Sequence, residues 1–272
     1  MTTRRFITTL LIIVLTLSGT TRTLASPRDD QKDNDTTEGQ ESEEHQAQVV
    51  WEQAIAAKGG RKRLYAVRNM VISSRWEYRS SSFKMIPVRQ EEVFVFPNKY
   101  WFWNDLRPDV FGLSVEMYNY ETGMYYHLTP GNPHSPPVPI IDTRSPNISL
   151  MNAQLFYLLE TKWLKPTLVK ASKGRIGTRA VDIVQTTVNN ERIDFAFDQK
   201  THLPIRISEY GNGTTRTSLV VQYLSDYIES GGIKMPQMLR GDANDHAYKE
   251  SIQINVEYNE DIFNNPPSME TE

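Results

Sequence analysis

The chain of 272 residues contains no cysteine. It therefore cannot form a disulfide, a thiolate metal site or a cysteine nucleophile, and a lipid-modified N-terminal cysteine is excluded as well. Small exported proteins commonly depend on disulfides for their stability. If this chain is exported, its hydrophobic core alone must hold it together.

Motifs for catalysis and metal binding are also missing. The five histidines show no metal-ligand spacing, and neither His-Glu-x-x-His nor Gly-x-Ser-x-Gly occurs. His127 lies in a predicted strand, where we expect a hydrogen-bonded sheet residue rather than a base. We therefore expect no enzyme activity, no cofactor and no metal. A hydrolase built on His127 and a nearby acid stays open as a third alternative.

The sequence has no excess of positive charge. Its formal net charge is −3, and once the basic N-terminus and an acidic segment are set aside, the charges of the remaining chain balance. A neutral body gives no electrostatic reason to expect nucleic acid or an anionic membrane surface as a partner.

The N-terminus has the pattern of an export signal. Arg4 and Arg5 precede an apolar run over residues 6–17, and a Thr-Leu-Ala tripeptide ends at Ala25. The run is shorter than the roughly 20 apolar residues of a membrane-spanning helix. Residues 1–25 are therefore predicted to be a signal peptide cleaved after Ala25, which places the protein in the periplasm. An uncleaved signal anchor is the alternative.

A strongly acidic stretch follows at residues 26–45. It carries eight acidic residues and no apolar residue larger than proline. Such a segment cannot bury enough surface to offset its chain entropy, so it is predicted to be a disordered spacer. The folded part is expected to be a single domain over residues 46–268.

The remaining pattern is dominated by strands. A helix is predicted at residues 47–58, where Gly59 and Gly60 end it. Short turns and the lack of a strand–helix–strand rhythm favour an antiparallel sheet. Its strands are predicted at residues 70–78, 90–96, 100–104, 113–120, 124–128, 167–173, 179–188, 192–198, 203–210, 218–227 and 251–258.

Two segments interrupt the strands. Residues 129–146 hold six prolines and are predicted to be a loop. Residues 147–161 form a predicted helix whose apolar positions extend almost all the way round. A helix this apolar must be covered on two sides, or must itself cover another element.

Several motifs resemble the LolA/LolB/LppX superfamily of exported proteins. The resemblance covers most of residues 47–267 and is clearest in FAFDQKTHLPIRISEY, YLSDYIESGGIKMPQMLRG and INVEYNEDIFNNPP, together with the opening AIAAKGGRKRLYAVRNMVISS. Turn chemistry explains the Gly and Leu-Pro positions of these motifs, so the motifs indicate the fold rather than a function. Function does not follow from fold alone.

The resemblance implies one curved antiparallel sheet of about 10–11 strands that forms an incomplete barrel. Two or more helices would cover its open side. In that superfamily the cavity holds lipid or the acyl chains of lipoproteins. The expectation is therefore a soluble, monomeric periplasmic carrier without catalysis, with lipid or a lipoprotein acyl chain as its ligand. Envelope membrane proteins are the further partners to be considered.

Aromatic residues crowd the first strands and supply the candidate site. Trp101 and Trp103 alternate onto one face of a strand, and Tyr100 and Phe102 onto the other. These residues either fill a core or line a cavity that the 150–159 helix closes as a lid. The runner-up function is accordingly an envelope protein-interaction or assembly module with a filled core. The candidate cavity residues are Trp76, Phe94, Trp101, Trp103, Tyr118, Tyr125, Leu150, Leu155 and Leu159.

Overall fold

A computed structural model describes most of the folded chain. The predicted signal peptide, residues 26–34 of the predicted spacer, most of the proline-rich segment and the last residues of the predicted domain lie outside the described part. Within that part, no helix is both long and apolar enough to span a membrane. The described residues are 35–79, 85–105, 113–128, 138–139, 148–210, 220–241 and 246–264.

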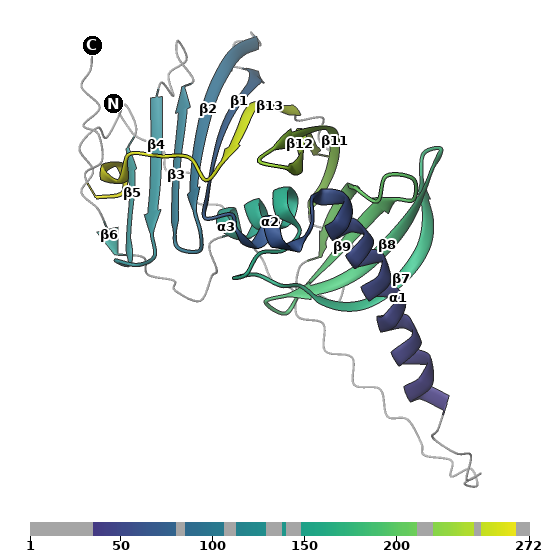
Figure 1. Cartoon of the computed structure of the whole chain (residues 1–272). Helices are drawn as coiled ribbons and strands as arrows, with labels where there is room; N and C mark the ends of the chain where they lie inside the picture. Colours follow the sequence, from purple (N-terminus) through teal and green to yellow (C-terminus); the bar gives the residue numbers. More distant parts are fainter. Residues whose placement is uncertain are drawn as a thin grey trace, which may run out of the picture.

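One antiparallel sheet of thirteen strands makes up most of the described chain, in the order β6-β5-β4-β3-β2-β1-β13-β12-β11-β10-β9-β8-β7 (Figure 1). The strongly twisted sheet does not close, because β6 and β7 are its two edges. This confirms the predicted open, curved antiparallel sheet. The strands are β1 (Asn69–Arg79), β2 (Met85–Val95), β3 (Lys99–Asp105), β4 (Leu113–Asn119), β5 (Met124–Leu128), β6 (Val138–Pro139), β7 (Thr167–Ile176), β8 (Arg179–Val188), β9 (Glu191–Asp198), β10 (Pro204–Tyr210), β11 (Val220–Ser230), β12 (Ile233–Gly241) and β13 (His246–Ile254).

Several strands differ from the prediction; β2, for example, begins at Met85 rather than at residue 90. The segment that forms β12 was not among the predicted strands, and the two-residue β6 lies in the predicted proline-rich loop. β13 ends at Ile254, although a strand was predicted to continue to residue 258. The reason is Asn255, which adopts a φ of 52° and donates its side-chain amide to the carbonyl of Ala66.

Most of the helices in the described chain lie on one face of the sheet, and only the short η2 covers the other. The helices are α1 (Asp35–Lys58), α2 (Arg61–Tyr65), α3 (Ile148–Ala153), the π-helical turn η1 (Gln154–Leu158) and the short η2 (Glu260–Phe263). The predicted helix at 47–58 is confirmed, but it begins earlier, at Asp35. Residues 35–45, which we expected within the disordered spacer, are helical because this stretch is rich in glutamate and glutamine, two good helix formers.

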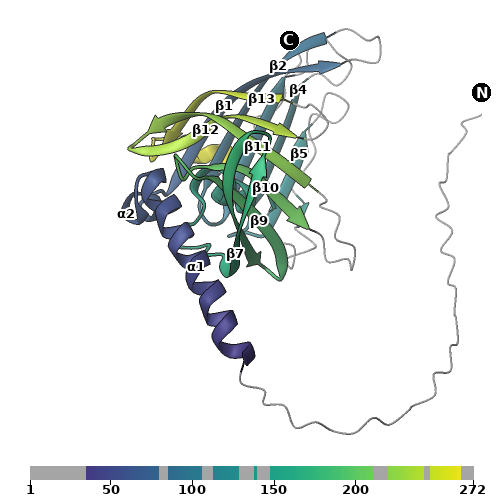
Figure 2. The same ribbon diagram turned by 90° about the vertical axis from the view of Figure 1, so that its right-hand side faces the viewer.

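α1 packs against the sheet through one buried stripe. Ala47, Trp51, Ala54, Ile55 and Lys58 recur at helical spacing, and each is almost completely buried. The stripe contacts β7, β8 and β12. The two views together show α1 running along this end of the sheet (Figures 1 and 2).

Two glycine pairs meet where α1 ends. The amide of Gly60 donates to the carbonyl of Ile55 and that of Gly59 donates to Ala56, a Schellman-type helix end. A Cβ atom on Gly59 would lie 2.2 Å from the carbonyl oxygen of Gly232, in the β11–β12 turn. A side chain at Gly59 would therefore push the helix away from the turn.

The sheet is packed on both faces. We call the face that contacts α1, α3 and η1 the inner face; it carries the main hydrophobic core. On the outer face of β2–β5, a second cluster is covered by η2, and the Tyr126 hydroxyl donates to the Ile262 carbonyl at 2.8 Å. Its buried members are Val93, Trp101, Val115, Met117, Tyr126, Leu128 and Phe263.

Candidate functional site

A row of aromatic side chains crosses the inner face of β2–β5. Phe94, Tyr100, Tyr118 and Tyr125 lie directly opposite one another on successive strands. Their ring centroids are separated by 5.0, 6.1 and 4.5 Å along this sequence. Such spacings correspond to ring–ring contact, so these four residues, the aromatic row, form a continuous apolar band.

The aromatic row is buried at one end and partly exposed at the other. Phe94 and Tyr100 have exposed fractions of 2% and 6% and belong to the main core. Tyr118 and Tyr125 are half-buried, and so is Tyr120, which stacks on Tyr118 with ring centroids 6.2 Å apart. The row therefore offers aromatic surface at its β4–β5 end without any change to the core.

Polar side chains flank the row on the same face. The next row on this face lies two residues along each strand. Crossing from β4 to β1, it consists of Glu116, Phe102, Glu92 and Ile72, so acidic and apolar side chains alternate. Beyond them lies a polar row, which comprises Ser114, Asn104, Gln90, Ser74 and Lys249. With about 3.3 Å per residue, successive rows on one face are roughly 7 Å apart. The inner face thus changes from aromatic to polar over a short distance.

The polar groups are tied together where they are most buried. Lys249 has an exposed fraction of only 4%, and its ammonium group donates to the Ser74 hydroxyl at 3.0 Å. The same nitrogen lies 3.6 Å from a carboxylate oxygen of Glu92. The Tyr100 hydroxyl donates to Glu92 at 3.3 Å, which links the aromatic row to this polar cluster.

The phenol groups of the row stay neutral at physiological pH. Burial raises the pKa of Tyr100 far above its usual value, and the charges of Glu92 and Glu116 raise it further. Burial also raises the pKa values of Tyr118 and Tyr125. The row therefore presents rings with neutral hydroxyls, a surface suited to an apolar molecule that carries a few polar atoms.

α3 and η1 cover the buried end of the row. Every residue from Gln154 to Thr161 is buried, as the apolar pattern of the predicted helix indicated. The helix ends earlier than predicted, because Leu159 adopts a φ of 67° and turns the chain away. α3 contacts β3, and η1 contacts β12.

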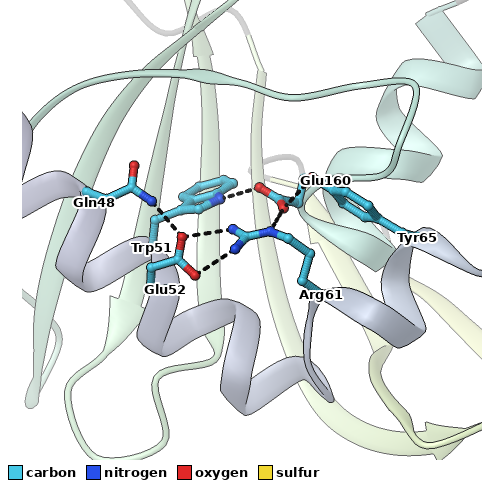
Figure 3. A network of polar contacts seen from close by, with 6 residues as sticks. All are labelled: Gln48, Trp51, Glu52, Arg61, Tyr65 and Glu160. Carbon is cyan, nitrogen blue, oxygen red and sulfur yellow. Dashed lines mark hydrogen bonds and ion pairs between the residues drawn. The ribbon is translucent and has the colours of Figure 1, made fainter.

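A polar network holds the end of this cover to α1 and α2 (Figure 3). Glu160 is 4% exposed and accepts hydrogen bonds from Trp51 Nε1 at 2.8 Å, Arg61 Nε at 2.6 Å and the Tyr65 hydroxyl at 3.0 Å. Arg61 also makes two 2.9 Å hydrogen bonds to the carboxylate of Glu52. The network satisfies a buried carboxylate and fixes where the cover attaches.

The predicted site residues divide between the two faces. Phe94, Tyr118 and Tyr125 belong to the aromatic row, and Leu150, Leu155 and Leu159 are buried in the cover that packs on the same face. Trp101 and Trp103 project from the outer face into the cluster under η2. They are not brought together with the other residues, because alternation along β3 sends them to the opposite side.

Trp76 occupies a different place on the inner face. It lies beyond the polar row, opposite Val88, and its indole donates to the side chain of Gln90 at 3.1 Å. The residues missed by the sequence reasoning include Tyr100 and Glu92. The period-two pattern of β2 and β3 could have found both, since it places them on the face that carries Phe94.

His127 meets an acid, as a hydrolase would require, but the pair is open to solvent. Its Nε2 lies 3.8 Å from Glu116 Oε1, and the two side chains are 42% and 35% exposed. This separation is longer than a hydrogen bond. Among the described residues, no group of three or more metal-ligating side chains comes together.

Comparison with known proteins gives similarity in fold alone. No family model and no curated protein sequence matches the chain. A LolA superfamily protein from Nitrosomonas europaea superposes with a TM-score of 0.50 at 10% identity, covering 80% of this chain and 97% of the other. The described sheet and its helical cover therefore have a LolA-like fold, as the tail motifs predicted.

Two further solved structures show weaker similarity over a comparable length. An outer membrane lipoprotein-sorting protein domain from Vibrio parahaemolyticus has a TM-score of 0.45 at 9% identity and covers 82% of this chain and 97% of its own. A DUF1329 family protein from Desulfovibrio piger also has a TM-score of 0.45, at 8% identity, with coverage of 80% and 97%.

Proposed function

We propose that this protein is a periplasmic carrier that binds an apolar ligand, a lipid or a lipoprotein acyl chain, on its inner face without chemical change. The observation that carries the proposal is the aromatic row, which runs from the half-exposed Tyr125 to the buried Phe94 under α3 and η1. An acyl chain laid along these rings would bury apolar surface on both partners. The LolA-like fold and the predicted export signal are consistent with this role.

The change from aromatic to polar side chains across the inner face would orient such a ligand. The acyl chain would lie on the aromatic row, and its polar end would reach toward the row that contains Gln90, Ser74 and Lys249. Those side chains can donate or accept hydrogen bonds, so a polar head placed there keeps its partners. An alkane without a polar head should therefore bind more weakly than a fatty acid of the same length.

Native mass spectrometry of the protein purified from its own cell envelope tests the proposal. We expect a bound lipid mass and saturable uptake of a fluorescent fatty acid. Tyr118→Ala and Tyr125→Ala should each weaken uptake by about tenfold, the value of one lost aromatic contact. Trp103→Ala on the outer face of β3 is the matched control and should leave uptake unchanged. Absence of both lipid and uptake would sink the carrier proposal.

The periplasmic location has its own test. Cleavage after Ala25 would give a mature N-terminus beginning Ser-Pro-Arg, which sequencing of the protein from the soluble envelope fraction would reveal. An intact N-terminus in the membrane fraction would instead show a signal anchor.

A second candidate is an envelope protein-interaction or assembly module. The observation that favours it is the main core, in which buried side chains continue from Trp51 on α1 through Leu155 on η1 to Phe94 on β2. A filled interior of this kind needs no ligand for stability. A partner protein that is pulled down equally well before and after delipidation would favour this function over the carrier.

A further inference from the structure

The outer face carries a pocket far along the sheet from the aromatic row. It has a volume of about 390 Å³ and is formed by the β7–β8 hairpin together with β10, β11 and β12. Its lining combines apolar residues (Ile176, Ile205, Leu224 and Met238), two arginines (Arg179 and Arg240), Tyr223 and Ser225. This mixture differs from the polar surface expected of a free sheet face.

The base of the pocket is apolar and firmly packed. Ile205 is 8% exposed and joins Val181 and Ala196 in a small cluster of their own on the outer face. Ile176 and Ile183 pack on this cluster and are themselves half-buried. The pocket therefore offers an apolar floor to any group that enters it.

Two guanidinium groups, those of Arg179 and Arg240, line the pocket. Arg206, Tyr223 and Arg240 are directly opposite one another on β10, β11 and β12, so they share the outer face. The Arg240 guanidinium lies 5.4 Å from the centre of the Tyr223 ring, and both residues line the pocket. Arg179 opens β8 on the same face.

The neighbouring carboxylates of the described chain are already engaged. Asp198 accepts hydrogen bonds from the amides of Lys200 and Thr201; burial raises its pKa, but these bonds and the charge of Arg179 lower it by more. Asp226 accepts from the Ser225 hydroxyl. No ion pair within the described residues involves Arg179, Arg206 or Arg240.

We propose that this pocket binds an anionic oxygen-bearing group, a phosphate or a carboxylate, carried on a short apolar stem. Guanidinium groups recognise such anions through paired hydrogen bonds, and the stem would lie on the floor formed by Ile176 and Ile205. The headgroup of an amphiphile has this chemistry, and so does a small organic phosphate. The site is separate from the aromatic row and does not depend on the carrier function proposed for the inner face.

Nuclear magnetic resonance titration locates the binding. The probes are hexyl phosphate, inorganic phosphate and 1-hexanol. Hexyl phosphate should shift the amides of residues 223–225 and 238–240, and the amides of β3–β5 should not move. Tighter binding of hexyl phosphate than of inorganic phosphate supports a stem on the apolar floor, and equal binding of the two overturns it. Hexanol binding as tightly as hexyl phosphate overturns the proposal, as does the absence of shifts up to millimolar concentrations.

Charge-removing variants complete the test. Arg179→Gln and Arg240→Gln should each weaken hexyl phosphate binding by about tenfold or more, the effect of one lost charge-assisted hydrogen bond. Arg175→Gln is the matched control, because this exposed arginine lies on the same hairpin but faces away from the pocket. It is opposite Ala180 on the inner face, and its guanidinium donates to the Thr178 carbonyl. If all three variants bound hexyl phosphate as tightly as the parent, or all three lost the same affinity, the proposed binding site would be wrong. Unchanged fatty-acid uptake by these variants keeps this result distinct from the inner-face proposal.

Discussion

The two ends of the inner face are built from similar residues but differ in how far helices cover them. On β9, Phe195 and Phe197 are 0% and 1% exposed and lie edge-on to Trp51 of α1, with ring centroids 5.2 and 5.8 Å away. On β4 and β5, Tyr118 and Tyr125 face the same side of the sheet and are only half-buried. The long helix α1 covers the first pair and contacts β7 and β8 rather than β4 or β5.

This difference in cover decides which rings a ligand could contact without disturbing the core. Aromatic rings under α1 are core residues, because a ligand could reach them only by removing the helix. Rings at the β4–β5 end can contact a ligand while the core remains intact. Their hydroxyl groups also lower the cost of partial exposure to water. We therefore infer that the β7–β10 end is the scaffold and that the β3–β5 end is the ligand-binding surface.

The largest effect is expected when a ring is removed from the scaffold end. Phe195→Ala should lower the free energy of unfolding by about 3–5 kcal/mol, because a buried phenylalanine leaves a cavity. Tyr118→Ala, its counterpart at the other end, should cost about 1 kcal/mol, since much of that ring is already in water. Urea unfolding followed by circular dichroism measures both. Equal losses in the two variants would mean that both ends serve as core.

The next effect concerns the network that attaches the cover between the two ends. Glu160→Ala would leave Trp51, Arg61 and Tyr65 without their shared acceptor, so we expect a loss of about 2–4 kcal/mol in unfolding free energy. Glu52→Ala is the control: its side chain is 42% exposed, and an exposed ion pair contributes less than about 1 kcal/mol. If the Glu52 variant lost as much as the Glu160 variant, burial would not govern this network.

Local chemistry made much of the fold predictable. The Gly59-Gly60 helix end is observed, and so is the turn at Asn189-Asn190, where both asparagines have positive φ. The DQKT segment within FAFDQKTHLPIRISEY is also a turn, in which the Asp198 side chain accepts from the amides of Lys200 and Thr201. These residues act on neighbours within a few positions, so their effect can be read from the sequence.

The candidate site was less predictable, because its assembly depends on distant parts of the chain. Alternation correctly separates Trp103 from Phe102, but both faces of β3 are aromatic, so the pattern does not say which face meets the helices. That choice is made by η2, which covers the outer face from the far end of the sequence. Likewise, Glu160 finds Trp51 from 109 residues away, a contact that no local motif encodes.

Lys58 is an exception within the well-packed scaffold end. It is 0% exposed, its ammonium nitrogen has no hydrogen-bond partner in the described chain and lies 5.4 Å from the Tyr227 ring. Burial lowers its pKa from 10.5 to about 7. Between these values the unfolded chain binds a proton that the folded protein does not, so folding stability rises with pH through this range.

Replacing Lys58 with methionine should therefore stabilise the protein. We expect Lys58→Met to raise the free energy of unfolding at pH 7 by up to about 4 kcal/mol, with an advantage over the parent that shrinks by up to about 1.4 kcal/mol per pH unit toward pH 9. Measurements stay below pH 9 because burial raises the pKa of tyrosines such as Tyr227, whose ionisation destabilises the fold at higher pH. A constant difference across pH 7–9 would show that Lys58 keeps its proton in the folded state.

The smallest effect sharpens the assignment of the β3–β5 end, because it tests the ring of Tyr118 separately from its hydroxyl. Tyr118→Phe keeps the stacking on Tyr100 and Tyr125 and removes one polar atom from a half-buried position. We expect the free energy of unfolding to change by less than about 0.5 kcal/mol and fatty-acid uptake to stay within about twofold of the parent. If uptake instead fell as far as in Tyr118→Ala, the hydroxyl would be the recognition group. The ligand would then have to offer a polar atom at the aromatic row, and the orientation proposed from the gradient of the inner face would be reversed.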